Sequence, residues 1–188
     1  MITDRWGNTL TLTDMEVVKD TPGRVMKFNG ATSKVDCGAP DTLVGDKTFI
    51  AWIKPSGYGE NVQPIILGNG KMFLLIQEAL SNIRFSSDAG TFANSANSAV
   101  ELGKWFMITV TRTSAGIANI YKNGSITGAA DQNSGTPTAG TTNIIIGNVT
   151  GQTNTFDGLI EPVRIYDGLW SVEEISQEWS EGRIRYGV

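Results

Sequence analysis

The sequence predicts an all-β fold, a two-sheet antiparallel sandwich of the jelly-roll type with one short C-terminal helix. Three observations support this. Of the 188 residues, 22 are glycine, 20 threonine and 13 asparagine, which suits short strands and tight turns because threonine fits a pleated surface and the other two accept positive φ. Charged residues are only 18% of the chain, which is low for a helical bundle. Roughly 11 to 13 short segments have strand-like patterns and are separated by turn residues.

The N-terminal residues 1–23 are polar, and Asn8–Thr13 alternates like an exposed strand. We interpret 1–23 as either an arm or the first strand, and residues 24–188 as the globular domain. Arg24–Phe28 is a predicted strand with a short partner at Lys34–Cys37.

The central strand of the sandwich is expected at Thr48–Pro55, which is apolar on both faces. Pro55 should end it, because proline lacks the amide that a strand ladder needs. We expect Trp52 and Trp105 to seal the gap between the two sheets.

The middle of the chain contains hairpins marked by glycine and asparagine turns. Their predicted strands are Pro64–Leu67 and Lys71–Gln77, Ile83–Ser87 and Gly90–Phe92, and Trp105–Arg112 and Ile117–Lys122.

The last third of the chain starts with a long loop, Asp131–Thr142, and a strand within Asn143–Gly147. Phe156–Tyr166 is a final strand, which Pro162 should interrupt with a bulge or a free edge. The helix begins with the capping box Ser171-Val172-Glu173-Glu174, places Val172, Ile175 and Trp179 on one face, and should end at Gly182.

Charge and residue usage exclude several functions. The net charge is −4 and no basic run exceeds two residues, so we expect no nucleic-acid partner. No apolar stretch approaches the roughly 18 residues of a membrane span, so we expect no membrane insertion. Histidine is absent, which excludes Ser-His-Asp and Cys-His catalysis. Cys37 is the single cysteine of the sequence, so it cannot form an internal disulfide, and we expect a small buried side chain. No apolar signal-peptide core is visible. We expect cytoplasmic synthesis without classical export and a location on a virion or extracellular surface; the alternative is an export signal outside this sequence.

Several segments occur in an order that resembles the laminin-G-like, concanavalin-A-like jelly rolls of the lectin and glucanase superfamily. The resemblance covers residues from about 24 to 182 and rests on Phe28-Asn29-Gly30, Phe49–Pro55, Leu102–Trp105, Ile120–Gly124, Ile145–Gly147, Phe156–Glu161, Val163–Tyr166 and Leu169–Ile175. It implies a fold used mostly to bind carbohydrate or protein, often with a calcium ion.

The chain departs from that family at the calcium ligands. Ala31–Lys34 stands where the family has an acidic residue or two, and Glu161-Pro162 stands where it has Asp-Glu. We therefore expect no required cofactor. Asp157 and Glu161 could still coordinate calcium, and the competing interpretation is a solvated Asp157 and a Glu161 paired with Arg164.

Glycoside hydrolysis needs two carboxylates that face each other across a cleft. The resemblance to laminarinase-like members implies Glu, Asp and Glu alternating on one strand, and no predicted strand carries that pattern. The four glutamates of the helix should form its solvated face. We therefore expect no catalytic residues.

A ligand site is predicted where the loops Ser56–Asn61 and Glu78–Asn82 emerge at one end of a meander. They bring together one aromatic side chain, two carboxylates and two amides, a set that suits a hydroxyl-rich ligand or a cation. These residues are Tyr58, Glu60, Asn61, Glu78 and Asn82. The alternative interpretation is a pair of ordinary polar turns.

Three functions remain open. The first is a non-catalytic recognition or adhesion module, a lectin that binds a glycan or surface polymer on a virion or cell surface. The second is a structural decoration or tail component of a viral particle, whose residues 1–23 dock or self-assemble on a protein by strand addition. The third is a glucanase-like hydrolase.

Overall fold

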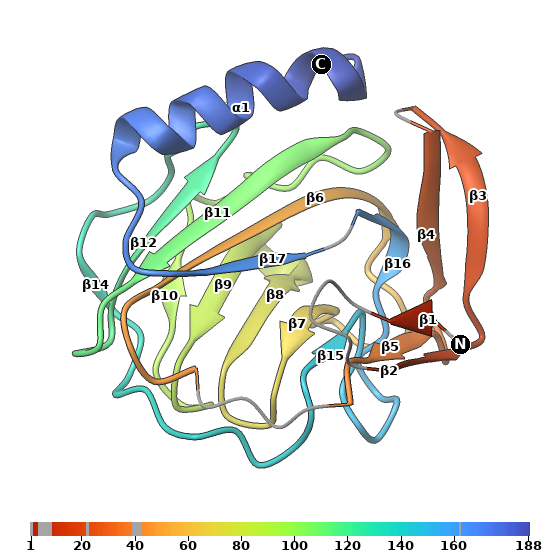
Figure 1. The fold of residues 1–188 in the computed structure, drawn as a ribbon, viewed down its shortest axis with the longest axis horizontal. Coiled ribbons are helices and arrows are strands. Elements are labelled where there is room, and N and C mark those ends of the chain that lie inside the picture. The colour runs from red at the N-terminus through yellow and green to blue at the C-terminus, as the bar shows by residue number, and fades with distance from the viewer. Residues whose placement is uncertain (1, 4–8, 22, 39–42, 162) are drawn as a thin grey trace.

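A computed structural model describes residues 2–3, 9–21, 23–38, 43–161 and 163–188. It contains two antiparallel β-sheets packed face to face, with one helix lying across the outside of one sheet (Figure 1). The predicted all-β sandwich with a C-terminal helix is confirmed. No helix in these ranges is long and apolar enough to span a bilayer.

The first sheet has eight strands. In spatial order they are β1 (Ile2–Thr3), β2 (Thr9–Thr13), β5 (Lys34–Asp36), β15 (Ile145–Ile146), β7 (Ile65–Gly68), β8 (Phe73–Gln77), β9 (Asn82–Ser86) and β10 (Ala93–Asn94).

The second sheet has nine strands. Its main path is β13 (Ser125–Ile126), β12 (Ile117–Lys122), β11 (Phe106–Arg112), β6 (Lys47–Gly57), β16 (Asp157–Ile160), β4 (Gly23–Asn29) and β3 (Glu16–Asp20); β14 (Gln132–Asn133) pairs with β12 and β17 (Arg164–Asp167) with β6. More strands are present than we expected because several contain only two residues.

The N-terminal strands belong to the sandwich. β2 pairs with β5 in one sheet and β3 pairs with β4 in the other, so consecutive strands connect the two layers at one side of the molecule (Figure 1). The predicted pairing of β5 with β4 is wrong, because β5 lies in the opposite sheet, between β2 and β15. The chain turns between the two strands, where the Asn29 side-chain oxygen accepts hydrogen bonds from three successive backbone amides.

The interior between the sheets is apolar and close-packed. Phe106, Ile108 and Val110 point into it from β11, as the alternation predicts, and Leu74 and Phe85 face them from the other sheet. The two long runs on β6 and β11 therefore form the centre of the core.

Helix α1 (Val172–Tyr186) covers the outer face of the nine-stranded sheet. Trp52 and Trp105 lie there, under the helix, so our expectation that they seal the gap between the sheets is wrong. The Trp52 ring stacks on Tyr186 at a centroid distance of 3.9 Å and on Trp179 at 5.3 Å. Every residue from Phe49 to Ile53 is apolar, so the sequence pattern did not distinguish the inward face of β6 from its outward face.

The helix begins at the predicted cap. The Ser171 hydroxyl accepts from the Glu174 amide, and the Glu174 carboxylate accepts from the Ser171 amide. It continues past Gly182, where we expected it to end, and stops at Gly187, which has a left-handed conformation with φ 69°. Val172 is 55% exposed, so it does not share the buried face with Ile175.

Further boundaries differ from prediction. The strand that pairs with β9 is Ala93–Asn94, where we expected Gly90–Phe92, and β14 lies inside the predicted loop Asp131–Thr142. β6 passes Pro55 and ends at Gly57. Pro55 pairs with Gly158 and Gly57 with Asp157, so the extra residue of the bulge in β6 is Ser56. The predicted strand 156–166 is divided into β16 and β17, which pair with successive parts of β6. The predicted cause, Pro162, lies outside the described residues.

Candidate functional site

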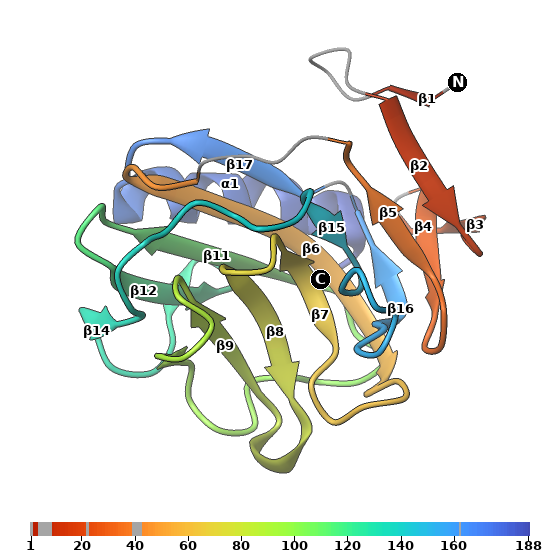
Figure 2. The same cartoon turned by 90° about the horizontal axis from the view of Figure 1, so that it is seen from below.

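The outer face of the eight-stranded sheet lies on the opposite side of the molecule from helix α1 (Figure 2). The strand register shows which side chains lie on this outer face, because directly paired residues of neighbouring strands point to the same side of the sheet. Alternate residues Leu74, Phe85 and Ile146 are in the core, so their neighbours along each strand point outward. The outward rows are Ile145–Gly68–Phe73–Ser86 and Ile65–Leu75–Arg84–Asn94.

A hollow of about 190 Å³ opens on this face. It lies over β15 and β7, beside Phe73 on β8, and its other wall is the loop after β15. The lining residues are Gly68, Gly70, Phe73, Thr142, Ile145, Asn148, Val149, Thr150 and Gly151.

The floor of the hollow depends on Gly68. This glycine lies between Ile145 and Phe73 in the outward row, and a Cβ there would meet the Phe73 ring at 2.8 Å. A glycine inside a strand removes one side chain from a packed row, which lets another group approach the backbone. The missing side chain therefore leaves space beside a half-buried aromatic ring.

The loop wall is held in place by Asn148, which is fully buried. Its Nδ2 donates to Thr155 Oγ1 at 2.6 Å, and its Oδ1 accepts from the amides of Val149 and Asn154 at 2.8 and 3.2 Å. Because these bonds use both ends of the carboxamide, the wall is preorganised before any ligand binds.

The lining carries no charged side chain, and it combines an aromatic ring with threonine hydroxyls and backbone groups. An apolar surface with a few fixed polar groups is typical of small-molecule sites. The sequence patterns did not predict this hollow: the Gly68-Asn69-Gly70 motif indicates only a turn, and the opposite wall comes from a loop about 80 residues later. The one signal present in the sequence is a glycine in the register of a strand.

The predicted loop-end site is partly assembled. The two loops are joined by a hydrogen bond from the Glu78 amide to the Val62 carbonyl, and the Tyr58 hydroxyl lies 2.7 Å from Ser81 Oγ. The exposed Glu60 accepts from the Thr155 hydroxyl at 2.7 Å. Asn61 and Glu78 are exposed at this end. Asn82 is only 1% exposed, so its side chain is not presented there.

The two predicted metal ligands lie apart. Asp157 and Glu161 are four residues apart along one stretch of chain, about 13 Å at 3.3 Å per residue. Asp157 lies beside Gly30 and Gly57, whereas Glu161 accepts from Arg185 of the helix at 3.3 Å. Arg164, our alternative partner for Glu161, pairs with Glu178 instead. In the described ranges, no three acidic, cysteine or histidine side chains gather as a metal site.

A second pocket of about 210 Å³ lies between helix α1 and its sheet. Two glutamates line it, Glu161 and Glu178, and each accepts a hydrogen bond from an arginine. Burial, together with the nearby Glu161 carboxylate, raises the pKa of the Tyr186 hydroxyl above its ordinary range. The charged groups of this pocket are used to hold the helix on the sheet.

Comparison with known proteins agrees with this architecture. The family model described as the concanavalin A-like lectin/glucanases superfamily matches residues 29–176. No curated protein matches the sequence significantly.

Three solved structures illustrate the similarity. Domain 4 of an extracellular arabinanase from Geobacillus stearothermophilus, in complex with arabinotriose, has a TM-score of 0.69 at 18% identity and covers 91% of this chain and 87% of that one. The receptor-binding domain of botulinum neurotoxin D has a TM-score of 0.71 at 15% identity, and the match covers 96% of this chain and 49% of that one. Trypanosoma rangeli sialidase has a TM-score of 0.68 at 14% identity, and the match covers 90% of this chain and 29% of that one. At these identities the likeness concerns the fold, and the chain spans half or less of the last two.

Proposed function

The chain belongs to the concanavalin A-like lectin/glucanase superfamily, and from this premise we propose that it is a non-catalytic glycan-binding module. The sugar site is the hollow over Gly68. The observation that carries this proposal is a preorganised, uncharged depression with an aromatic wall.

The chemistry of the hollow matches a sugar ring. A pyranose or furanose has apolar C–H faces and a rim of hydroxyls. An aromatic ring packs against a C–H face of the sugar. Threonine hydroxyls and backbone groups of 148–151 supply hydrogen-bond donors and acceptors for the sugar hydroxyls. The similar arabinanase domain was solved with a bound trisaccharide, which supports a carbohydrate ligand for this chain.

The test is a glycan array followed by titration of the glycans that bind. We expect Phe73→Ala to weaken binding about ten-fold, because the ring and its contact area are lost. Tyr58→Ala is the matched control, since it removes an aromatic ring from the loop-end site. Equal affinities of Phe73→Ala and wild type would contradict the hollow as the site, and loss in Tyr58→Ala alone would move the site to the loops.

We expect no hydrolysis in the hollow. A glycosidase needs one protonated and one ionised carboxyl flanking its substrate, and the hollow is lined by no acidic residue. Incubation with each bound glycan should release no reducing ends. Release that persists in a highly purified sample would restore the glucanase hypothesis.

The second hypothesis, a virion component that mainly makes protein contacts, stays a prediction from the sequence. Its signature would be oligomers whose mass rises with protein concentration in light scattering.

A further inference from the structure

A positively charged side chain lies on the same sheet face as the hollow. Arg84 is on β9, paired with Leu75 of β8, so it is the diagonal neighbour of Phe73 in the outward rows. Its side chain is half-buried among uncharged outward residues. The chain as a whole is acidic, yet within the described ranges no carboxylate pairs with this arginine.

The guanidinium group is fixed from two sides. Its carbon lies 3.9 Å from the centroid of the Phe92 ring, and its Nε donates to Asn94 Oδ1 at 3.1 Å. Asn94 is itself held by Gln132, whose carboxamide accepts from the Asn94 amide and donates to its carbonyl. Stacking and the Nε bond together set the plane of the group.

This arrangement leaves the two terminal nitrogens of Arg84 available, since in the described structure only Nε of this guanidinium donates a hydrogen bond to the protein. The acid of the same hairpin, Asp88, does not compete for them. Its carboxylate accepts from the amides of Gly90 and Thr91 at 2.8 and 2.7 Å and is committed to the turn.

Two parallel N–H groups with a fixed plane match the two oxygens of a carboxylate. A half-buried cation without an acidic partner has already lost part of its hydration, so a ligand carboxylate adds a charge-assisted bond at reduced desolvation cost. Partial burial also lowers the pKa of the guanidinium, although arginine stays charged at neutral pH.

We propose that Arg84 makes this module selective for acidic polysaccharides, by binding the carboxylate of a sugar residue in a chain whose neighbouring part occupies the hollow. The inference rests on the proposed function and adds the ligand class to it. Two to three strand spacings separate Gly68 from the β9–β10 edge, about 10–15 Å at 4.8 Å each. The ligand is therefore an oligosaccharide, since a single sugar cannot reach both positions.

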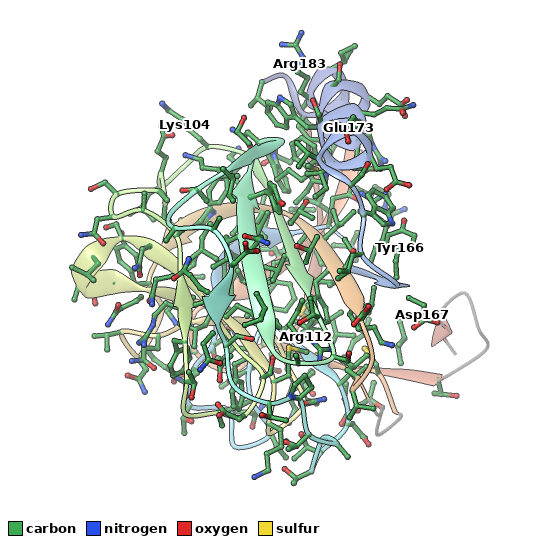
Figure 3. All side chains as sticks on the ribbon, turned by 90° about the vertical axis from the view of Figure 1, so that its left-hand side faces the viewer. Lys104, Arg112, Tyr166, Asp167, Glu173 and Arg183 are labelled. Atoms are coloured by element: carbon green, nitrogen blue, oxygen red, sulfur yellow. The ribbon has the colours of Figure 1, made fainter. Side chains whose placement is uncertain are left out.

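The experiment compares uronic-acid oligosaccharides with their carboxyl-reduced forms, which keep the same linkages and lose only the charge. Titrations use wild type, Arg84→Gln and the matched control Arg183→Gln, which removes the same charge from helix α1 (Figure 3). Wild type should bind an acidic chain about ten-fold more tightly than its reduced form, and salt should reduce the difference. Arg84→Gln should abolish this preference and retain the affinity for the reduced form, whereas Arg183→Gln should keep both.

Three other results would overturn the role of Arg84, the proposed function or both. Equal binding of acidic and reduced forms by wild type overturns the inference and leaves the proposed function intact. Equal loss in both arginine variants overturns it as well, since any surface charge would then suffice. Absence of binding to every glycan overturns the proposed function and the inference with it.

A second variant guards against misfolding of Arg84→Gln. Arg84→Lys keeps the charge and loses the planar fork, so we expect an intermediate preference for the acidic form. Full retention of the preference in Arg84→Lys would contradict the two-nitrogen contact. Preference for sulfated over carboxylated chains in wild type would contradict the assignment of a carboxylate.

Discussion

Replacing Gly182 by alanine tests how helix α1 seats on its sheet. In an ordinary helix this change stabilises by about 1 kcal/mol, because glycine has the larger backbone entropy to lose. Here a Cβ would lie 2.4 Å from Cζ2 of Trp52, well inside van der Waals contact. Trp52 cannot yield easily, since its ring is 2% exposed and stacked against Tyr186 and Trp179.

Overpacking of this kind costs about 1–3 kcal/mol. Subtracting the propensity gain leaves a net destabilisation of about 1 kcal/mol, or about 2–4 °C in Tm for a domain of this size. Denaturant titration followed by tryptophan fluorescence measures it, with Ser180→Ala on the exposed side of the helix as control. Stabilisation of Gly182→Ala by about 1 kcal/mol would refute the close approach of helix and sheet.

Three further predictions follow from individual contacts. Hydrogen bonds from Lys104 and then Lys122 lower the pKa of Glu101 from 4.5 to about 2, so this exposed group stabilises the fold above pH 4.5 and loses that effect as the pH falls toward 2. Glu101→Gln should reduce the acid-induced loss of stability by about 0.2–1 kcal/mol in urea titrations at stepped pH, and an unchanged pH profile would contradict the pairing. Phe85→Ala, which empties a fully buried core position, should cost about 3–5 kcal/mol in denaturant titration, and a cost below about 1 kcal/mol would show that Phe85 is not in a packed core. Removal of calcium with EDTA should change neither Tm nor glycan affinity, because Asp157 and Glu161 lie apart and Glu161 contacts Arg185; a Tm that rises with added calcium would restore the metal site.

Local chemistry made much of the fold predictable. The alternation of Trp105–Arg112, the hairpin around Asn123-Gly124 and the capping box at Ser171 each act within a few residues, and each is present as expected. Asn123 and Gly124 both have positive φ, as a primed hairpin turn requires.

The failures concern choices that local patterns leave open. β6 is apolar on both faces, so periodicity alone did not place Trp52 under the helix. A glycine at position 182 is typical of a helix end, but here it lets the helix approach the ring of Trp52. The helix ends at Gly187. Both outcomes depend on packing between segments more than 100 residues apart.

The candidate site also combines features that act locally with contacts between distant segments. The loop-end site is predicted from neighbouring hairpins, and in the structure the Tyr58 hydroxyl of one loop lies 2.7 Å from Ser81 Oγ of the other. The hollow needs Gly68 from one hairpin and the 148–151 loop from another part of the chain, joined by the β7–β15 pairing. Local patterns do not indicate that these two parts of the chain meet.

We propose that a sugar occupies the hollow over Gly68, and amide chemical shifts recorded during a titration can locate the bound sugar. With ¹⁵N-labelled protein and an oligosaccharide that binds on the array, we expect the largest shifts at Gly68, Gly70, Thr142 and 150–151, with smaller ones along β8 and β9. Shifts concentrated at Tyr58, Glu60, Asn61 and Glu78, with the Gly68 amide unmoved at saturation, would contradict the claim.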